Sequence, residues 1–412
     1  MTPRTSHGLV TAVMALACET APAVINEPAG TWITESAFEI GDELEGDALF
    51  TRVDHVQVST DGQRVFVLEG GIERLTVWTP GGSLVQDVGG PGDGPGELMG
   101  AREIGLVQDG YYVRDSRRFT FFTHSGAVAR TVSYPPPSVS FHGFRIEPRL
   151  LVDEGRFLGV PVVPAHVMAG WLGDDPIHEL PVLGVSRERD RWGVDTLLFL
   201  DLRNRDLHVG PGDASFAWGV HSRQPYHDAD ERDFDPGTGT VVVLKKNREP
   251  GSIRLMELSS DGDTVWQQDL SRPVVPFSPE VLDDLVEWLV QGLVAQTRGS
   301  GSPLSRGDAR KAVDEALYVP DFYPAGNVVR AMVSGDVWFE TYEQSGVDTL
   351  ETWFALRRGG NESGLRRILL PLDFSPHAAT HTHVWGIRRD TLGINFVVGR
   401  RLVRHVPDRA GN

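Results

Sequence analysis

The 412-residue sequence predicts an all-β fold made of a repeated unit of short antiparallel strands. Short β-rich runs recur along the chain and are separated by tight turns such as Asp61-Gly62, Asp109-Gly110 and Glu154-Gly155. Successive glycines of these turns are 48 and 45 residues apart, a period that fits a four-stranded blade. We count six such units and therefore predict a six-bladed β-propeller.

The predicted units follow one another with the same order of strands and turns. Thr31–Ile40 alternates polar and apolar residues like a half-buried strand. The fourth unit is the least regular, because an acidic loop is expected at 228–235. The last unit, 383–406, lacks one strand, and we expect the strand at 31–40 to complete it. That pairing would close the ring and leave no open sheet edge between the termini.

The first interruption of the repeat is the segment 164–180, inside the third unit. Its apolar side chains Met168, Trp171 and Leu172 form either a small local core or a contact surface for another protein. Insertions of repeat proteins often emerge together on the binding face. We therefore expect a protein partner or a small ligand on the face that carries the insertions.

The second interruption, 276–325, predicts helices before the fifth blade. Ser278-Pro279 is an N-cap and N1 pair, and apolar residues follow it at helical spacing. We expect Trp288, just off that apolar face, to pack onto the propeller. With this helical insertion, residues 31–406 form the propeller and 407–412 a tail.

Residues 1–18 predict a lipoprotein-type signal peptide. Arg4 is followed by an apolar run too short to span a bilayer and by small residues before Cys18. The end of the run resembles a bacterial lipobox, with Ala15 where leucine is usual. We expect Cys18 to be lipidated, residues 19–30 to act as a tether, and the protein to be extracytoplasmic, in the periplasm or at the cell surface. A secreted protein is the alternative.

The charge of the chain excludes some partners. The sequence carries 57 acidic and 39 basic residues, a formal net charge of −18. This field repels a phosphate backbone, so no nucleic acid partner is expected. No polybasic run favours anionic lipid, so membrane contact is expected through the N-terminal lipid only. Cys18 is the single cysteine, which excludes an internal disulfide and a cysteine nucleophile. We expect a monomer.

A junction between units carries the sharpest sequence resemblance. Residues 89–105 (GGPGDGPGELMGAREIG) resemble the NHL repeat, with Leu98 where phenylalanine is usual. Over roughly residues 30–405 the layout is similar to a bacterial family of six-bladed β-propeller lipoproteins. The shared features are Trp32, VPDFYP at 319–324, and the closing Trp385, Asp390 and Gly393. The resemblance implies an extracytoplasmic, membrane-tethered propeller and supplies no catalytic residue.

Two clusters are candidate metal ligands. His381 and His383 share one face of a strand, and His377 or Asp390 could complete a zinc site. A chance pair of histidines is the alternative. Four aspartates of the acidic loop could bind calcium, although the loop lacks the glycine and glutamate of an EF-hand and a solvated loop is the alternative. These aspartates are Asp228, Asp230, Asp233 and Asp235.

No sequence motif supplies a catalytic nucleophile. G-x-S-x-G and H-E-x-x-H are absent, and the glycine-rich loop 89–96 lacks the lysine of a phosphate-binding loop. We therefore expect a non-catalytic binding or scaffold module without a cofactor. The alternative is a calcium- or zinc-dependent hydrolase or lactonase of the gluconolactonase and paraoxonase type, whose metal ligands are scattered over several blades. A carbohydrate-binding groove would need exposed aromatic side chains, for which Trp338 and Trp353 are candidates, although alternation along their strands favours a place in the core.

Overall fold

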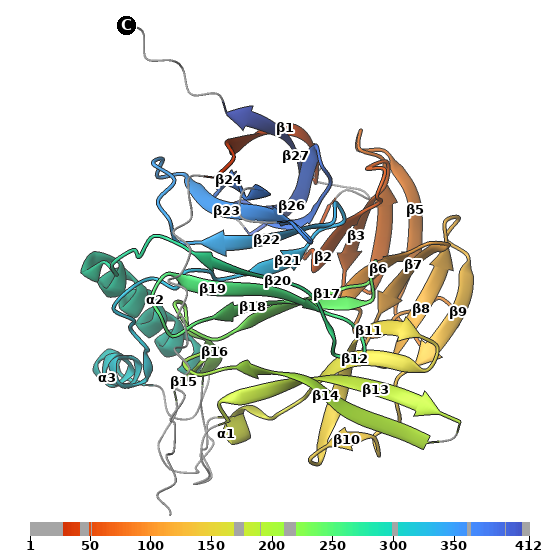
Figure 1. The fold of residues 1–412 in the computed structure, drawn as a ribbon, viewed down its shortest axis with the longest axis horizontal. Helices are drawn as coiled ribbons and strands as arrows, with labels where there is room; N and C mark the ends of the chain where they lie inside the picture. The colour runs from red at the N-terminus through yellow and green to blue at the C-terminus, as the bar shows by residue number, and fades with distance from the viewer. Residues whose placement is uncertain are drawn as a thin grey trace, which may run out of the picture.

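The computed structural model describes residues 28–41, 49–50, 52–168, 177–189, 191–209, 220–298, 304–360, 364–391 and 393–405. These residues form an all-β fold in which antiparallel sheets are arranged around a central region, as in a propeller (Figure 1). Cys18 and residues 407–412 lie outside the described residues. Within those ranges, no helix combines the length and the apolar character needed to cross a membrane.

Among the described residues, four separate sheets of four or five strands correspond to the first four predicted units. Consecutive strands of each sheet pair antiparallel, and in Figure 1 their inner strands converge toward the middle of the view. The strands are β2 (His55–Val58), β3 (Val65–Glu69), β4 (Arg74–Trp78) and β5 (Leu84–Gly89); β6 (Glu103–Val107), β7 (Gly110–Arg114), β8 (Arg118–Thr123) and β9 (Val128–Ser133); β10 (Ser140–Phe141), β11 (Phe144–Asp153), β12 (Arg156–Pro161), β13 (Glu179–Glu188) and β14 (Arg191–Asp201); and β17 (Glu231–Asp235), β18 (Thr240–Lys246), β19 (Ser252–Leu258) and β20 (Thr264–Ser271).

The last two units and the first strand form one eight-stranded sheet. Its strands are β21 (Val329–Ala331), β22 (Asp336–Thr341), β23 (Leu350–Arg357), β24 (Arg366–Pro371), β25 (Phe374–Ala379), β26 (His383–Arg389), β27 (Asn395–His405) and β1 (Thr31–Ile40). Strand β1 pairs antiparallel with β27 from Thr31↔His405 to Ile40↔Val397. The red first strand and the blue last strand accordingly lie side by side in Figure 1. The predicted pairing of the first strand with the last ones is confirmed.

The predicted count of six separate blades is not met. Strand β1 also pairs parallel with β24 at Thr31↔Arg367, which joins the last two units into one sheet. Two further backbone hydrogen bonds support this junction, from Ala29 N–H to the Leu365 carbonyl and from Arg367 N–H to the Gly30 carbonyl. The strand that closes the last unit therefore also bonds to the unit before it.

The fourth unit differs from its prediction. Residues 231–235, expected within an acidic loop, form strand β17. The preceding segment forms a separate two-stranded sheet of β15 (Asp206–Val209) and β16 (Val220–Arg223). Two aspartates of β17 have partners at the polar centre of the fold, Asp233 with the Ala331 N–H and Asp235 with the Arg358 guanidinium.

Two helices, α2 (Pro279–Thr297) and α3 (Arg306–Ala316), lie between β20 and β21, and the short helix α1 (Ala165–Met168) lies in the first insertion. The Ser305 side chain caps α3 by accepting from Asp308 N–H. The two helices pack on one another and on Leu207 of β15, and they lie at one side of the molecule in Figure 1. Trp288 is 70% exposed, so the prediction that it packs onto the propeller is wrong. Helix α2 instead buries Val286, Val290 and Leu293, together with Thr297 at its end.

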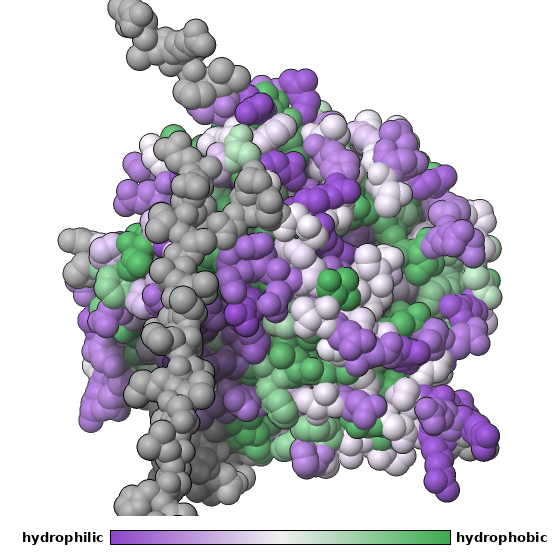
Figure 2. Space-filling model, viewed as in Figure 1, coloured by the Kyte–Doolittle hydropathy of each residue, from purple (hydrophilic) through white to green (hydrophobic). Residues whose placement is uncertain are grey.

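The apolar core lies between neighbouring sheets. All residues of β3 and of β7 are buried, because both faces of each strand are covered. One cluster joins Leu68 and Leu75 of the first sheet to Tyr111 and Phe122 of the second. The outer strand β9 is almost wholly accessible. Figure 2 shows the resulting surface, on which hydrophilic residues are spread widely and hydrophobic ones form smaller areas.

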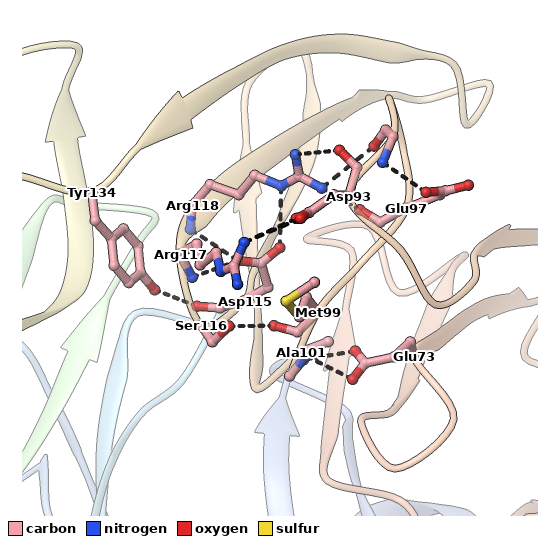
Figure 3. A network of polar contacts seen from close by, with 12 residues as sticks. Glu73, Asp93, Glu97, Met99, Ala101, Asp115, Ser116, Arg117, Arg118 and Tyr134 are labelled. Carbon is pink, nitrogen blue, oxygen red and sulfur yellow. Dashed lines mark hydrogen bonds and ion pairs between the residues drawn. The ribbon is translucent and has the colours of Figure 1, made fainter.

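The junction motif at 89–105 has a structural role. The Glu73 carboxylate accepts from Gly100 N–H (2.6 Å) and Ala101 N–H (2.8 Å), which ties the loop to the β3–β4 turn (Figure 3). Gly94 N–H donates to the Glu97 carboxylate at 2.7 Å. A side chain at Gly92 would lie 2.0 Å from that carboxylate. An acidic group of the loop itself therefore occupies the place that a bound phosphate would need.

The turn at 115–118, which follows β7 in the second sheet, also binds the junction motif. Asp115 accepts from the N–H groups of Arg117 and Arg118 at 2.8 and 2.9 Å (Figure 3). The Arg118 guanidinium donates to the carbonyls of Asp93 (3.1 Å) and Glu97 (3.0 Å). The motif therefore connects two neighbouring sheets through charge-assisted hydrogen bonds.

Candidate functional site

A cavity of about 1320 Å³ lies where the inner strands converge. The inner strand of each predicted unit contributes at least one titratable side chain to its wall, and β17 contributes Asp235 besides Asp233. One from each strand forms a ring: His55 of β2, Glu103 of β6, Arg149 of β11, Asp233 of β17, Arg330 of β21 and His377 of β25. Successive side chains of a strand point to opposite faces, so the residue next to each of these points toward a neighbouring sheet, while the named side chain points toward the centre. The cavity is therefore lined by polar groups held on strands.

Three of these side chains connect neighbouring inner strands. His377 Nδ1 accepts from Val56 N–H at 3.4 Å, and His55 Nδ1 accepts from Ile104 N–H at 3.2 Å. Asp233 accepts from Ala331 N–H at 2.9 Å. Each of these backbone N–H groups belongs to the inner strand of the next unit, so the bonds run around the axis.

Both histidines are neutral and share one tautomer. Burial lowers the pKa of His55 to about 4, and burial also holds the pKa of His377 well below its ordinary value. Since Nδ1 of each ring accepts a hydrogen bond, Nε2 carries the proton. In the described part of the chain neither Nε2 has a hydrogen-bonding partner. Their rings contact edge to face, with centroids 5.7 Å apart.

The acidic side chains of the cavity differ in how they are paired. Glu103 accepts from the buried Arg114 guanidinium at 3.0 Å, and Arg114 also donates to Glu147 at 3.1 Å. Among the described residues, Asp233 forms no ion pair and accepts a hydrogen bond from Ala331 N–H alone, and burial raises its pKa to about 6. Asp235 forms an ion pair with Arg358 at 2.5 Å.

Both arginines of this ring on the inner strands are weakly paired. Among the described residues, the Arg330 guanidinium forms no ion pair and donates only to the Val329 carbonyl, at 3.2 Å. Arg149 lies 3.7 Å from Glu147, and its Nε is buried without a partner in the described structure. Arg330 and Arg149 are therefore the groups best able to bind an acidic ligand.

A side pocket of about 630 Å³ adjoins the cavity, because both are lined by Arg52, Asp54, Arg330 and His377. Four carboxyl groups line this pocket, those of Asp54, Glu340, Glu351 and Asp373. Glu351 accepts from the indole N–H of Trp353 at 2.7 Å, and burial raises its pKa to about 7. Burial also raises the pKa of Glu340. Arg330 stands where the two spaces meet.

The structure does not assemble the predicted histidine site. His381 is exposed and its Nε2 lies 3.4 Å from the Arg357 guanidinium, while His383 Nδ1 lies 3.0 Å from the Thr382 hydroxyl. Asp390 accepts from Ile394 N–H at 2.8 Å in the turn after β26. His383 begins β26 and Asp390 follows its end, which places them roughly 20 Å apart. Within the described residues, no three acidic, histidine or cysteine side chains are grouped as metal ligands.

The four aspartates of the predicted acidic loop point to different partners. Asp228 accepts from the Tyr318 hydroxyl, and Asp230 accepts from the backbone N–H groups of Asp201 and Lys246. Asp233 and Asp235 have the partners described above. The segment therefore brings no calcium ligands together.

The remaining predicted residues are only partly described. Met168 is half-buried and packs on the core beneath the third sheet, whereas Trp171 and Leu172 lie outside the described residues. Trp338 and Trp353 are 1% and 3% exposed, as alternation in their strands predicted. Neither tryptophan forms an exposed aromatic surface.

Sequence reasoning missed all six cavity side chains except His377 and Asp233, and it gave those two other roles. The sequence does contain a pattern that marks these positions. Five of the six precede a turn glycine by five to seven residues: His55 before Gly62, Glu103 before Gly110, Arg149 before Gly155, Asp233 before Gly239 and Arg330 before Gly335. The turn that ends each inner strand therefore indicates where its central residue lies.

Comparison with known families finds no match, and comparison with curated protein sequences finds none either. Solved structures match over most of the chain at low identity. A member of the DUF4221 family from Bacteroides vulgatus is 7% identical with a TM-score of 0.45, over 92% of this chain and 100% of that one. The Neurospora crassa Pan2 WD40 domain is 10% identical with a TM-score of 0.37, over 91% and 97%. The PQQ-bound aldose sugar dehydrogenase from Streptomyces coelicolor is 11% identical with a TM-score of 0.36, over 92% and 100%.

Proposed function

We propose that this protein is a non-catalytic binding module that holds a small molecule in its central cavity. The observation that carries this proposal is the ring of polar side chains from the inner strands, with two of its cations available. The cavity of about 1320 Å³ is large enough for a metabolite-sized ligand. Rigid strands position these side chains, which suits selective binding. Under this proposal the ligand would bind at the axis, whereas the sequence alone favoured the face that carries the insertions.

We further propose a six-bladed ring and an extracytoplasmic location. The strand order β21–β22–β23–β24 followed by β25–β26–β27 with β1 supports counting the eight-stranded sheet as two blades. Lipid attached at Cys18, after a signal peptide at 1–18, would hold the propeller through the tether at 19–30 as an NHL-like lipoprotein. The sequence features at Arg4, Ala15 and Cys18 support this location.

The experiment asks whether a small molecule bound to the purified protein is lost when the cavity is blocked by a larger side chain. Full-length protein is purified without denaturant, and small molecules released from it are analysed by mass spectrometry. Gln57, which lines the cavity, is replaced by tryptophan, and the control Val265→Trp adds the same indole on the outer strand β20. We expect a stoichiometric small molecule in wild type and control, and its loss from Gln57→Trp.

Equal recovery from both variants, or no recoverable molecule from any, would contradict the proposal. Chemical change of the recovered molecule during incubation would instead favour the hydrolase alternative. In that case Glu351 and Glu340 of the side pocket are the first carboxyl groups to test.

A further inference from the structure

Resting on the proposed function, we propose that the ligand carries an oxyanion, a carboxylate or a phosphate, and that Arg330 and Arg149 bind it together with the imidazole Nε2–H groups of His55 and His377. These four groups line the same cavity and come from four different inner strands. All four are hydrogen-bond donors, and an oxyanion offers only acceptors.

The charge of the cavity differs in sign from the charge of the chain. Seven arginines line it against four carboxylates, although the whole chain has a net charge of −18. Those carboxylates are Asp54, Glu103, Asp233 and Asp235. Three of them already form ion pairs. Asp54 pairs with Arg52 at 2.8 Å, Glu103 with Arg114 at 3.0 Å and Asp235 with Arg358 at 2.5 Å. Glu147, outside the cavity wall, also pairs with Arg114 and Arg149. Among the described residues, Arg64, Arg102 and Arg330 form no ion pair, so these acids still leave positive charge in the cavity uncompensated.

Unused donors point to the same conclusion. Arg149 Nε and Arg64 Nη1 are both buried without a partner in the described structure, and both residues line the cavity. A buried donor without an acceptor is costly, and a bound oxyanion would supply the acceptor and the opposite charge.

The neutral histidines make the site selective for an anion. Because Nδ1 of each ring is held by a backbone N–H, the ring cannot turn to present an acceptor without breaking a bond between sheets. Each imidazole therefore presents N–H to the cavity. A ligand that is a cation, or that needs an acceptor at this position, would be disfavoured.

The test is isothermal titration of the purified full-length protein with four probes of different charge: succinate, inorganic phosphate, glycerol and putrescine. We expect succinate or phosphate to bind with 1:1 stoichiometry. Which of these two anions binds shows whether the site recognises a carboxylate or a phosphate. Arg330→Gln should weaken this binding roughly tenfold or more, and Arg330→Lys less, because it keeps the charge but loses the planar fork. The control Arg130→Gln changes the net charge equally on β9 and should leave binding unchanged.

The outcomes separate the two proposals. Binding of glycerol or putrescine alone, abolished by Gln57→Trp, would overturn the oxyanion assignment and leave the central binding site standing. Anion binding that Gln57→Trp does not affect would place the anion elsewhere and contradict both. No binding of either anion at low salt would overturn the oxyanion assignment. Circular dichroism of each variant shows that a loss of binding is not a loss of fold.

Discussion

His55 Nδ1 accepts a hydrogen bond from the backbone N–H of Ile104, 49 residues further along the chain and in the next sheet. A side chain at the axis thus takes part in holding two sheets together as well as in lining the cavity. Replacing His55 by leucine would leave the Ile104 N–H without its acceptor. We expect the free energy of unfolding to fall by about 1–2 kcal/mol, measured by urea denaturation. His124→Leu, at an exposed position, is the control, and an equal effect in both variants would contradict this role.

Asp233 makes stability depend on pH. Its pKa of about 6 lies above the ordinary value of 3.8 because the carboxyl is buried, with Arg330, Glu103 and Asp235 as charged neighbours. Between pH 4 and 6 the folded state therefore binds more protons than the unfolded state, so this group's contribution to stability falls as pH rises. Asp233→Asn should be more stable than wild type above pH 6, by about 1–2 kcal/mol, and equal to it below pH 4.

Urea denaturation of both proteins from pH 4 to 7.5 measures this difference. Asp195→Asn, at an exposed position of β14, serves as the control for removing one carboxylate. A difference between Asp233→Asn and wild type that does not change with pH would contradict the assignment.

Glu73 should be a stabilising residue of the junction. Its carboxylate accepts from two backbone N–H groups, at Gly100 and Ala101. Glu73→Ala removes both charge-assisted hydrogen bonds, and we expect a loss of about 2–3 kcal/mol in thermal or urea unfolding. Glu97→Ala removes one exposed hydrogen bond to Gly94 and should cost less than half as much. The reverse order of the two losses would show that the motif is held in another way.

Strand β1 should be required for a stable ring. Its removal (deletion of residues 31–40) would expose the edge of β27 and of β24, and unpaired strand edges promote association. We expect a lower unfolding temperature and soluble aggregates by size-exclusion chromatography. Deletion of residues 407–412 is the control and should change neither. A deletion variant that remains monomeric and equally stable would show that β1 does not close the sheet.

Cys18 tests the proposed anchor directly. Cys18→Ser should move the protein from the membrane fraction to the soluble extracytoplasmic fraction, because one lipidated residue supplies the membrane affinity. Cell fractionation with immunoblotting measures this. An unchanged membrane fraction would argue against lipidation at this position.

Local signals in the sequence predicted the architecture well. The turn glycines at 62 and 110 and the alternation in 31–40 were enough to place hairpins and the closing strand, because both depend on local backbone preference and period. The prediction for the fourth unit was wrong because its structure depends on tertiary contacts and not on local preference. Five acidic residues in 228–235 favour a loop by composition, whereas tertiary partners such as Ala331 N–H and Arg358 make part of it a strand.

The site could not be placed in the same way. His381 and His383 form a local pattern in the sequence. The side chains that meet at the axis of a propeller come from different units, and the spacing within one unit does not show which of its side chains points to the axis. His55 and His377 are 322 residues apart and their rings nevertheless contact at the axis. Only the common position of these residues relative to the turn glycines carries that information.

The pairing of β1 with β27 also decides how the molecule bears mechanical load. If residues 19–30 serve as the proposed tether from Cys18, tension on the membrane anchor would reach the propeller first through β1, which follows them in the sequence. Antiparallel pairs from Thr31↔His405 to Ile40↔Val397 would be strained together when the pull runs along the strand, instead of opening one after another. The strand that completes the sheet is therefore also the one that would resist extraction.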